Sequence, residues 1–510
     1  MGVYNEDSDR KYGRRTIFIN EEEKDLLALD IEALKKTLEE YIPIIVDIHE
    51  ENKEDIKYLW NYYLGVQDIL SKVKTVRPEI NNKKVENWAY AIIDFKKAWQ
   101  LGNPIQYVML NESSNDEIQT LNKYMRFVNK EAKDQEIYED ILVTGRGFRF
   151  TNTSKVTEDD EAPFEILNVD RDSCEVIYSA KMGHKQLFSV NINCMQDTII
   201  KDGEEELIYF PEITIYLRNK SLVCRYKNGI IEWDKGYKPI TINEHIITEY
   251  YVNRDRISLI EIGKDLFDGI NQIESLDFDD MEQFVNAIMV FTNAQVDEEG
   301  INEIRKLGAV NIKSTENRKA SVALLQNRLN AADTQVFYTR MLTALHQILG
   351  IPMATDNGSV TSGDTGKAKM TGQGYTSAGI RAKTDETMFK KCDFNSLKVI
   401  LKISKRNSKS EINTLKVSDV DSKMNRDMSD NLLVKAQGLS TLLSSRIPKE
   451  YALPIVNLFS DSNAVVQAMN KQEEKEQENQ NENNFQNINQ QVNEQNNKIK
   501  NVEETNLQSK

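Results

Sequence analysis

The chain has 510 residues, of which 39% are hydrophobic and 29% are charged. This composition allows a buried core, and the length fits three or four domain-sized units or one elongated subunit of several parts. The formal net charge of −16 argues against a conventional sequence-reading nucleic-acid-binding protein, because such proteins usually carry a basic surface. It does not exclude a protein that lets DNA pass without gripping it.

Neither disulfide bonds nor secretion are expected. The four cysteines are widely spaced, so the chain has no CxxC redox pair and no zinc-ribbon spacing: Cys174, Cys194, Cys224 and Cys392. The first residues, MGVYNEDSDRKYGRR, contain no apolar signal segment, and no run approaches about eighteen apolar residues. These features predict a reduced, intracellular, soluble protein that does not interact with membranes.

Residues 20–135 are predicted to be helical. The clearest helix lies within 85–99, where apolar residues recur at the spacing of one helical face: Val85, Trp88, Ala89, Ile92, Phe95 and Trp99. Gly102 and Pro104 follow it and favour a helix end there.

Residues 140–252 are predicted to be rich in β-strands. Short runs of β-forming residues lie at 174–180, 186–192, 212–217 and 221–226. Asn228 and Gly229 form the dipeptide that is typical of a tight hairpin turn. A meander or a small sandwich is the expected arrangement.

Helical periodicity returns at 257–349. One helix is predicted from Leu259 to Ile273, a second from Phe278 to Met289, and a third over 331–350, ending at Gly350 and Pro352. A loop rich in Gly, Ser and Thr follows at 353–366, and then a lysine-rich stretch that extends to about residue 406.

The C-terminal part is predicted to hold a small helical unit and a disordered tail. The helical unit covers 428–467, with Pro448 in a first helical turn. In the last forty residues, 471–510, nineteen are Asn or Gln, so this segment cannot bury enough apolar surface to offset its ordering entropy.

The sequence contains no complete catalytic motif. TSGDTGKA (361–368) resembles a phosphate-binding Walker loop, but Thr361 replaces its first glycine and Ala368 replaces the hydroxyl that binds magnesium. The four histidines form no ligand pair, and the acidic runs at 278–280 and 297–299 lack calcium-loop spacing, which favours solvated acidic surface. The chain is therefore not expected to be an enzyme, and we expect neither a cofactor nor a metal site.

Charge is unevenly distributed along the chain. Residues 251–299 carry twelve acidic and three basic side chains, a net charge of −9. Residues 361–410 carry eleven basic and four acidic side chains, a net charge of +7, and 300–330 carries six basic against two acidic. Ordinary surface charge would be the simplest explanation of this pattern.

The order of these segments resembles the portal protein family of long-tailed phages that infect Gram-positive bacteria. Three stretches carry the resemblance: YYLGVQDIL (62–70) with 81–107; KPITINEHIITEYYVNRD (238–255) with the helix 266–291; and LHQILGIPMATD (345–356) with SGDTGKAKM (362–370). Together they span roughly residues 55–465. Extra loop residues, among them Asp364, depart from the family pattern.

The resemblance implies an α+β, mainly α, subunit of a ring that usually has twelve copies. It implies a wing (1–275, helical over 20–135 and β-rich over 140–252), stem helices (276–293 and 331–350) and a small α/β clip (294–330). It further implies a tunnel loop (351–366), a long wing helix (367–406) and a crown (407–470), followed by the tail (471–510).

The resemblance also implies sites and partners. Double-stranded DNA would pass the tunnel loop and its basic continuation: Asn357, Gly358, Ser359, Thr361, Ser362, Gly363, Lys367 and Lys369. The terminase motor and head-completion or adaptor proteins would bind the clip: Arg305, Lys306, Lys313, Arg318 and Lys319. Major capsid and scaffold proteins would surround the wing of a ring that is assembled in the host cytoplasm and located at one capsid vertex of the virion.

Two other classes of protein remain as alternatives. A minor capsid or scaffold-associated protein would form no closed ring. An NTPase or nuclease would need a complete Walker loop or a cluster of metal-binding carboxylates.

Overall fold

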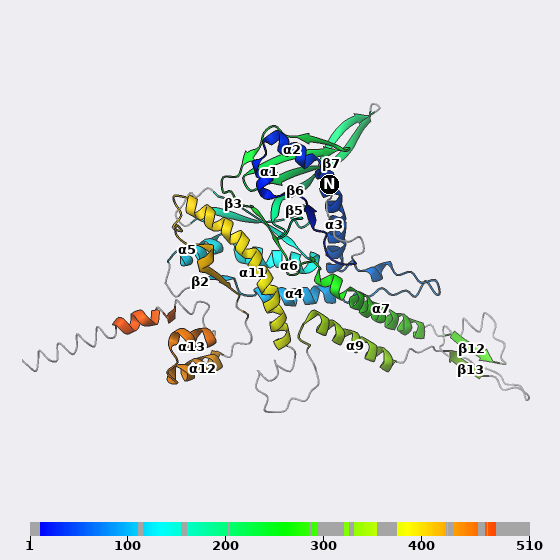
Figure 1. Cartoon of the computed structure of the whole chain (residues 1–510). Coiled ribbons are helices and arrows are strands. Elements are labelled where there is room, and N and C mark those ends of the chain that lie inside the picture. Colours follow the sequence, from blue (N-terminus) through cyan, green and yellow to red (C-terminus); the bar gives the residue numbers. More distant parts are fainter. Residues whose placement is uncertain are drawn as a thin grey trace, which may run out of the picture. The chain divides into compact units, whose positions relative to one another are not determined.

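The computed structural model describes residues 11–110, 116–154, 161–201, 204–285, 288–292, 321–325, 331–353, 375–424, 426, 432–456, 465–466 and 468–475 (Figure 1). The chain forms two compact units. The larger unit comprises Met1–Gln100, Ala132–Thr153 and Phe164–Ile403, and the smaller comprises Leu101–Glu131, Ser154–Pro163 and Ser404–Lys510. Helices and strands occupy largely separate segments of the described chain, as expected for an α+β protein.

A seven-stranded sheet forms one part of the larger unit. Its order is β1-β5-β6-β7-β8-β10, with β9 pairing to β8. The strands are β1 (Ile17–Ile19), β5 (Cys174–Ser179), β6 (Gln186–Lys201), β7 (Glu204–Tyr216), β8 (Lys220–Lys227), β9 (Ile230–Trp233) and β10 (Lys238–Pro239). Strands β5 to β9 form the predicted antiparallel meander, whereas β1 adds to β5 in parallel.

The turn between β8 and β9 confirms the expected hairpin. Asn228 and Gly229 both have positive φ angles, 49° and 82°, which a tight hairpin turn of this type requires.

Strands β6 and β7 extend well beyond their neighbours. Strand β5 pairs with β6 only as far as Asn191, and β8 pairs with β7 only from Glu212, whereas β6 and β7 pair with each other out to Lys201 and Glu204. Residues 193–201 and 204–211 therefore form a two-stranded ribbon that projects from the sheet (Figure 1).

Three helices cover the sheet and share a hydrophobic core with it. They are α1 (Glu23–Ala28), α2 (Ile31–Glu39) and α3 (Ile42–Tyr63). The Asp30 carboxylate caps α2 by accepting a hydrogen bond from the Ala33 amide at 2.8 Å, and Pro43 lies in the first turn of α3. Leu34, Leu38 and Ile45 pack on this core with Phe188 of the sheet, all fully or almost fully buried.

A second, three-stranded sheet also belongs to the larger unit. Its order is β11-β3-β4, with β11 at Ile247–Tyr250, β3 at Gly147–Thr153 and β4 at Phe164–Val169. The helices α4 (Trp88–Leu101), α6 (Lys130–Thr144) and α11 (Tyr375–Arg406) accompany it. Phe389 of α11 packs against both Tyr138 and Tyr250, with ring centroids 5.9 and 5.2 Å away.

The helices α7 (Leu259–Val285) and α9 (Ala331–Leu349) form an antiparallel pair (Figure 1). Two glycines of α7 let α9 approach closely. A Cβ atom at Gly269 would lie 3.0 Å from Met341, and one at Gly263 would lie 3.2 Å from Leu349.

The predicted helices ending at Ile273 and Met289 are wrong in detail. A single helix, α7, runs through both regions and ends at Val285, and Ile288–Thr292 forms strand β12, paired antiparallel with β13 (Ser321–Leu325). The predicted stem helix 276–293 is therefore too long. A short apolar run such as IMVF has no period that separates helix from strand, and the partner strand thirty residues later decides between them.

The smaller unit contains strand β2 (Gln106–Met109), which pairs with β14 (Val420–Lys423), and helix α5 (Asp116–Phe127). Glu117 of α5 accepts hydrogen bonds from the amides of Asn413, Thr414 and Leu415 and so holds that chain segment. Helices α12 (Leu432–Ser444) and α13 (Lys449–Val456) follow, and Pro448 directly precedes α13. Residues 468–475 are helical, so regular structure extends five residues into the predicted tail.

The short helices η1 (Asp68–Ser71) and η2 (Val417–Asp419) complete the described elements. The chain turns at residues 145–146, between the end of α6 and the start of β3. Gly145 has a φ of 91°, and a Cβ atom there would lie only 1.9 Å from the Arg256 carbonyl oxygen.

We expect Gly145→Ala to lower the free energy of unfolding by about 3 kcal/mol or more, because it adds a backbone clash to left-handed strain. Gly229→Ala is the matched control, since its φ is also positive but no atom lies within 4 Å of the added Cβ. Its loss should be only about 1–2 kcal/mol. Equal losses in chemical denaturation of the two variants would contradict the importance of the Arg256 contact.

Candidate functional site

The residues predicted to contact DNA lie outside the described part of the chain. This applies to the whole predicted set: Asn357, Gly358, Ser359, Thr361, Ser362, Gly363, Lys367 and Lys369. The predicted clip residues, Arg305, Lys306, Lys313, Arg318 and Lys319, also lie outside it. The segments on either side are described, and they form the candidate site.

Helices α9 and α11 flank the predicted tunnel loop. Helix α9 ends at Leu349 and is followed by Gly350, and the described chain resumes at Tyr375, the first residue of α11. The Arg381 side chain of α11 donates hydrogen bonds to the carbonyl oxygens of Gln347 and Ile348 in the last turn of α9. The two flanks are therefore directly joined.

Helix α7, which pairs with α9, binds an extended chain segment along one polar edge. Asn271, Ser275 and Asp279 follow each other at one-turn intervals and are buried. Their side chains accept hydrogen bonds from the amides of Glu86, Lys84 and Asn82 at 2.7, 3.0 and 2.6 Å. These three hydrogen bonds attach the backbone of residues 82–86 to the helix.

Asp279 departs from the expected acidic surface. Its side chain is only 1% exposed and lies 3.3 Å from the Lys72 ammonium group and 3.1 Å from that of Lys74. Burial alone would raise the pKa of Asp279, but hydrogen bonds from Asn82, Lys74 and Lys72 hold that pKa below its usual value. The prediction of solvated acidic surface at 278–280 is wrong for this residue, which is an internal ion pair.

Other acidic groups of α7 lie near like charges. Burial and the nearby carboxylates of Glu86 and Asp277 raise the pKa of Glu274, and burial together with Asp280 raises the pKa of Asp277. Negative potential therefore accumulates beside Glu86, which also accepts a hydrogen bond from Tyr338 of α9 at 2.9 Å.

A capping box begins α7. The Ser258 hydroxyl accepts a hydrogen bond from the Glu261 amide at 3.0 Å, and the Glu261 carboxylate accepts one from the Ser258 amide at 2.7 Å. The same carboxylate also accepts from the Gly13 amide at 2.9 Å and from the Arg14 guanidinium. The sequence signal for this box is Ser-x-x-Glu at 258–261.

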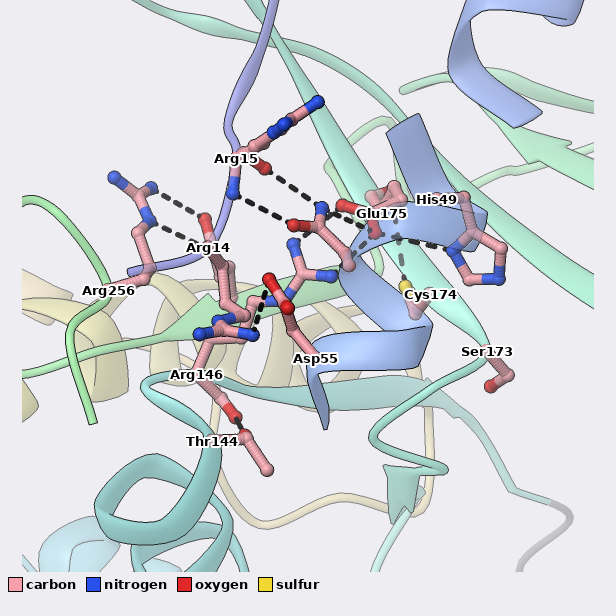
Figure 2. Close-up of polar contacts among 12 residues, drawn as sticks. Arg14, Arg15, His49, Asp55, Thr144, Arg146, Ser173, Cys174, Glu175 and Arg256 are labelled. Carbon is pink, nitrogen blue, oxygen red and sulfur yellow. Dashed lines mark hydrogen bonds and ion pairs between the residues drawn. The ribbon is translucent and has the colours of Figure 1, made fainter. Parts of the chain in front are cut away.

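The N-terminal segment that reaches Glu261 is held at further points. The Arg14 guanidinium is 2% exposed and pairs with Asp55 of α3 at 3.1 Å (Figure 2). The Asn52 amide side chain forms two hydrogen bonds with the backbone of Arg15, at 2.8 and 3.0 Å. Residues 13–15 thus bridge α3 and the start of α7.

A buried ion pair lies beside this segment. Arg146 donates two parallel hydrogen bonds to the Glu175 carboxylate of β5, at 2.6 and 2.5 Å (Figure 2). His49 Nδ1 lies 3.3 Å from the same carboxylate, and Asn52 donates to it at 3.2 Å. Burial alone would raise the pKa of Glu175, but the positive charge of Arg146 and the contact with His49 lower it to about 2.

A second buried pair follows along the chain. Arg256 donates to both oxygens of the Glu249 carboxylate, at 3.1 and 2.8 Å, and the Tyr178 hydroxyl donates to it at 2.5 Å. Burial would raise the pKa of Glu249, yet the Arg256 charge holds it below its usual value. In each pair an arginine neutralises a buried carboxylate, and Arg256 lies just before Ser258, the cap of α7.

In the described ranges, no three His, Cys, Asp or Glu side chains are grouped so that they could hold a metal ion. Likewise, none of the helices described is both long enough and apolar enough to cross a membrane. The described ranges contain the α7–α9 helix pair, with charged clusters at the start of α7 and along one edge of it.

The Glu175 pair predicts a pH dependence. Because its pKa falls from the usual 4.5 to about 2 on folding, this carboxylate stabilises the fold above about pH 4.5, and the stabilisation is lost as the pH falls towards 2. Glu175→Gln should cost roughly 3–5 kcal/mol at pH 7, since it leaves Arg146 without its counter-charge.

Thermal unfolding between pH 7 and pH 2 would measure this effect. The Glu175→Gln midpoint should depend less on pH, and the two proteins should converge near pH 2. Asp172→Asn, an exposed carboxylate in the turn before β5, is the control and should match the unmodified protein. Parallel curves for the Glu175 variant and the unmodified protein would contradict the assignment.

Comparison with known proteins identifies the family. The family model described as "Phage portal protein, SPP1 Gp6-like" matches residues 43–479, from the start of α3 past the end of α13. Comparison with the curated proteins finds no match. The match covers most of the chain and includes the α7–α9 pair, both loop flanks and the Arg146–Glu175 and Arg256–Glu249 pairs. The chain belongs to the phage portal protein family.

Proposed function

We propose that twelve copies of this chain form a closed ring through which double-stranded DNA is packaged, retained and ejected. Family membership over residues 43–479 carries the proposal. Portal proteins occupy a capsid vertex, and the ring would have the same location in the virion. It would be assembled in the host cytoplasm.

We assign the parts of the subunit to the described helices and strands. We place the wing in residues 1–275 and the long wing helix in α11, and the stem in α9 and the end of α7, which stops at Val285. The clip then begins at β12 and ends near β13, because these paired strands enclose the segment between them. The crown would comprise 407–470, with α12 and α13 at its centre.

Electrostatics supports a channel that does not hold DNA tightly. A ring multiplies every channel-facing charge by the number of subunits, and about six to ten phosphate contacts already make binding strong and steeply salt-dependent. A net charge of −16 per subunit keeps such contacts few. Part of the acidic charge of α7 is internal, as Glu261 and Asp279 show, so the exposed members such as Asp277 carry this effect.

Lys367 and Lys369 would supply the few phosphate contacts at the tunnel loop. Lysine acts as a point charge on the phosphate backbone and reads no bases. The basic clip residues would instead face the terminase motor and the head-completion proteins, while capsid and scaffold proteins would contact the wing. We further propose that the chain hydrolyses no nucleotide, since Thr361 and Ala368 remove two parts of a Walker loop.

The competing function is that of a minor capsid or scaffold-associated protein. Such a protein needs no closed ring. Rotationally symmetric particles with a central hole in electron micrographs would therefore separate the two functions.

A closed ring should have a mass near twelve times 58.7 kDa. A single mass is expected because a heterologous interface closes into a ring only at a fixed subunit number. Light scattering coupled to size separation would measure it. A stable monomer at every salt concentration would refute the ring.

Replacing both Lys367 and Lys369 by alanine should leave rings intact but alter DNA packaging, with a defect that varies with ionic strength. The matched control replaces Lys36 and Lys57, two exposed lysines of α2 and α3, and should package normally. Filled particles would be counted at several salt concentrations. Packaging by the Lys367/Lys369 variant that is normal at every concentration would remove these lysines from the channel.

A further inference from the structure

The C-terminus of α9 has backbone acceptors that need partners. The last carbonyl groups of any helix lack donors from within that helix, and together they carry partial negative charge. Gly350 adopts a φ of 66°, and the Ile351 amide returns to the His346 carbonyl at 2.9 Å. The carbonyl oxygens of Gln347 and Ile348 are left for donors from elsewhere.

Arg381 supplies these donors from the second turn of α11. Its Nη2 donates to the Gln347 carbonyl oxygen at 3.0 Å, and its Nη1 donates to that of Ile348. The planar guanidinium group can satisfy two neighbouring oxygens at once, whereas an ammonium group cannot match that fork. One side chain therefore fixes the end of one helix against the start of another, thirty-three residues later.

Gly350 is required by the same contact. A Cβ atom at this position would lie 2.1 Å from Arg381 Cδ and 2.7 Å from its Nε. Positive φ alone would favour glycine, but the close approach means that any larger residue must displace the Arg381 side chain.

The chain just beyond Gly350 is held independently. His346 Nδ1 lies 3.0 Å from the Pro352 carbonyl oxygen, so this nitrogen carries the proton and donates. The His346 ring also packs edge-on against Trp88 of α4, with centroids 5.8 Å apart. The direction in which the chain leaves α9 is thereby set.

The start of α11 is held by the same helix, α4. Tyr375 lies 5.7 Å from Trp99 between ring centroids, and Trp99 in turn stacks on Phe95. Ala378 and Ala382 are buried on this side of α11. Helix α4 therefore supports both flanks, and the Arg381 side chain links them to each other.

We infer that Arg381 is a positioning residue, which sets the spacing and orientation of the α9 end relative to the α11 start. Residues 354–374 are connected to both ends, so this spacing determines where they can meet DNA in the channel. The inference rests on the proposed function and adds a residue that does not itself touch DNA.

Variants of the full chain would test this role in a phage that lacks its own portal gene. The set is Arg381→Ala, Arg381→Lys, Gly350→Ala, the double variant Arg381→Ala/Gly350→Ala, and Lys383→Ala as an exposed, matched control on α11. Ring mass, thermal midpoint and DNA-filled heads would be measured for each variant. Because Arg381 is exposed, its loss should change the thermal midpoint little.

We expect Arg381→Ala to form rings of normal mass but to give about tenfold fewer DNA-filled heads. The loss of hydrogen bonds from a charged donor is expected to have an effect of about this size. Gly350→Ala should show the same defect, and the double variant should be no worse than either single variant. Arg381→Lys should restore filling in part, and Lys383→Ala should be normal.

Three results would overturn the inference: normal filling by Arg381→Ala, defects of the two single variants that multiply, or loss of rings with Arg381→Ala alone. Failure of the unmodified chain to form rings would instead refute the proposed function, so the two failures are distinguishable.

Discussion

The Glu261 carboxylate is the constraint on which the helix pair depends. It closes the capping box of α7 with Ser258 and also accepts from the Gly13 amide and the Arg14 guanidinium. A single carboxylate thus joins helix initiation to tertiary structure, since the residues it binds continue directly into β1. Glu261 therefore connects the start of α7 to the segment that leads into β1. This connection sets the direction of α7 and of α9, which packs against it.

Around this carboxylate, positive and negative groups alternate in a buried cluster. Arg14 pairs with Glu261, Arg146 with Glu175, and Arg256 with Glu249. Buried ion pairs contribute little net stability compared with apolar packing, but an unmatched member is costly. Such a cluster therefore favours one arrangement of its elements over near alternatives, which suits a helix pair whose position must be repeated in every subunit of a ring.

Much of the secondary structure could be predicted from sequence because it depends on local signals. The meander followed from alternation and from Asn228-Gly229, and the end of α9 followed from Gly350 and Pro352. The strand at 288–292 could not be predicted, since its partner lies at 321–325 and an apolar run fits either structure. Three separated stretches of the sequence indicate the family, and their order matters more than any one of them.

The candidate site was predicted less completely. The DNA-contacting residues that the resemblance implies, such as Lys367, lie outside the described ranges. The supporting residues Arg381 and Glu175 carry no local motif, because their roles come from partners thirty-three and twenty-nine residues away. Asp279 illustrates the same limit: an acidic run looks solvated in sequence, and only the fold brings Lys72 and Lys74 to it.

The projecting β6–β7 ribbon has a consequence for solubility. Beyond Asn191 and Glu212 none of the described strands pairs with its outer edges, so their backbone groups could pair with a strand of another molecule. Side chains such as Leu207 and Tyr209 are 57% and 66% exposed and would favour such aggregation. Residues 193–211 contain five acidic side chains and one lysine, so identical ribbons repel each other. Acidic charge therefore opposes aggregation of subunits through these strand edges, and high salt would weaken this repulsion.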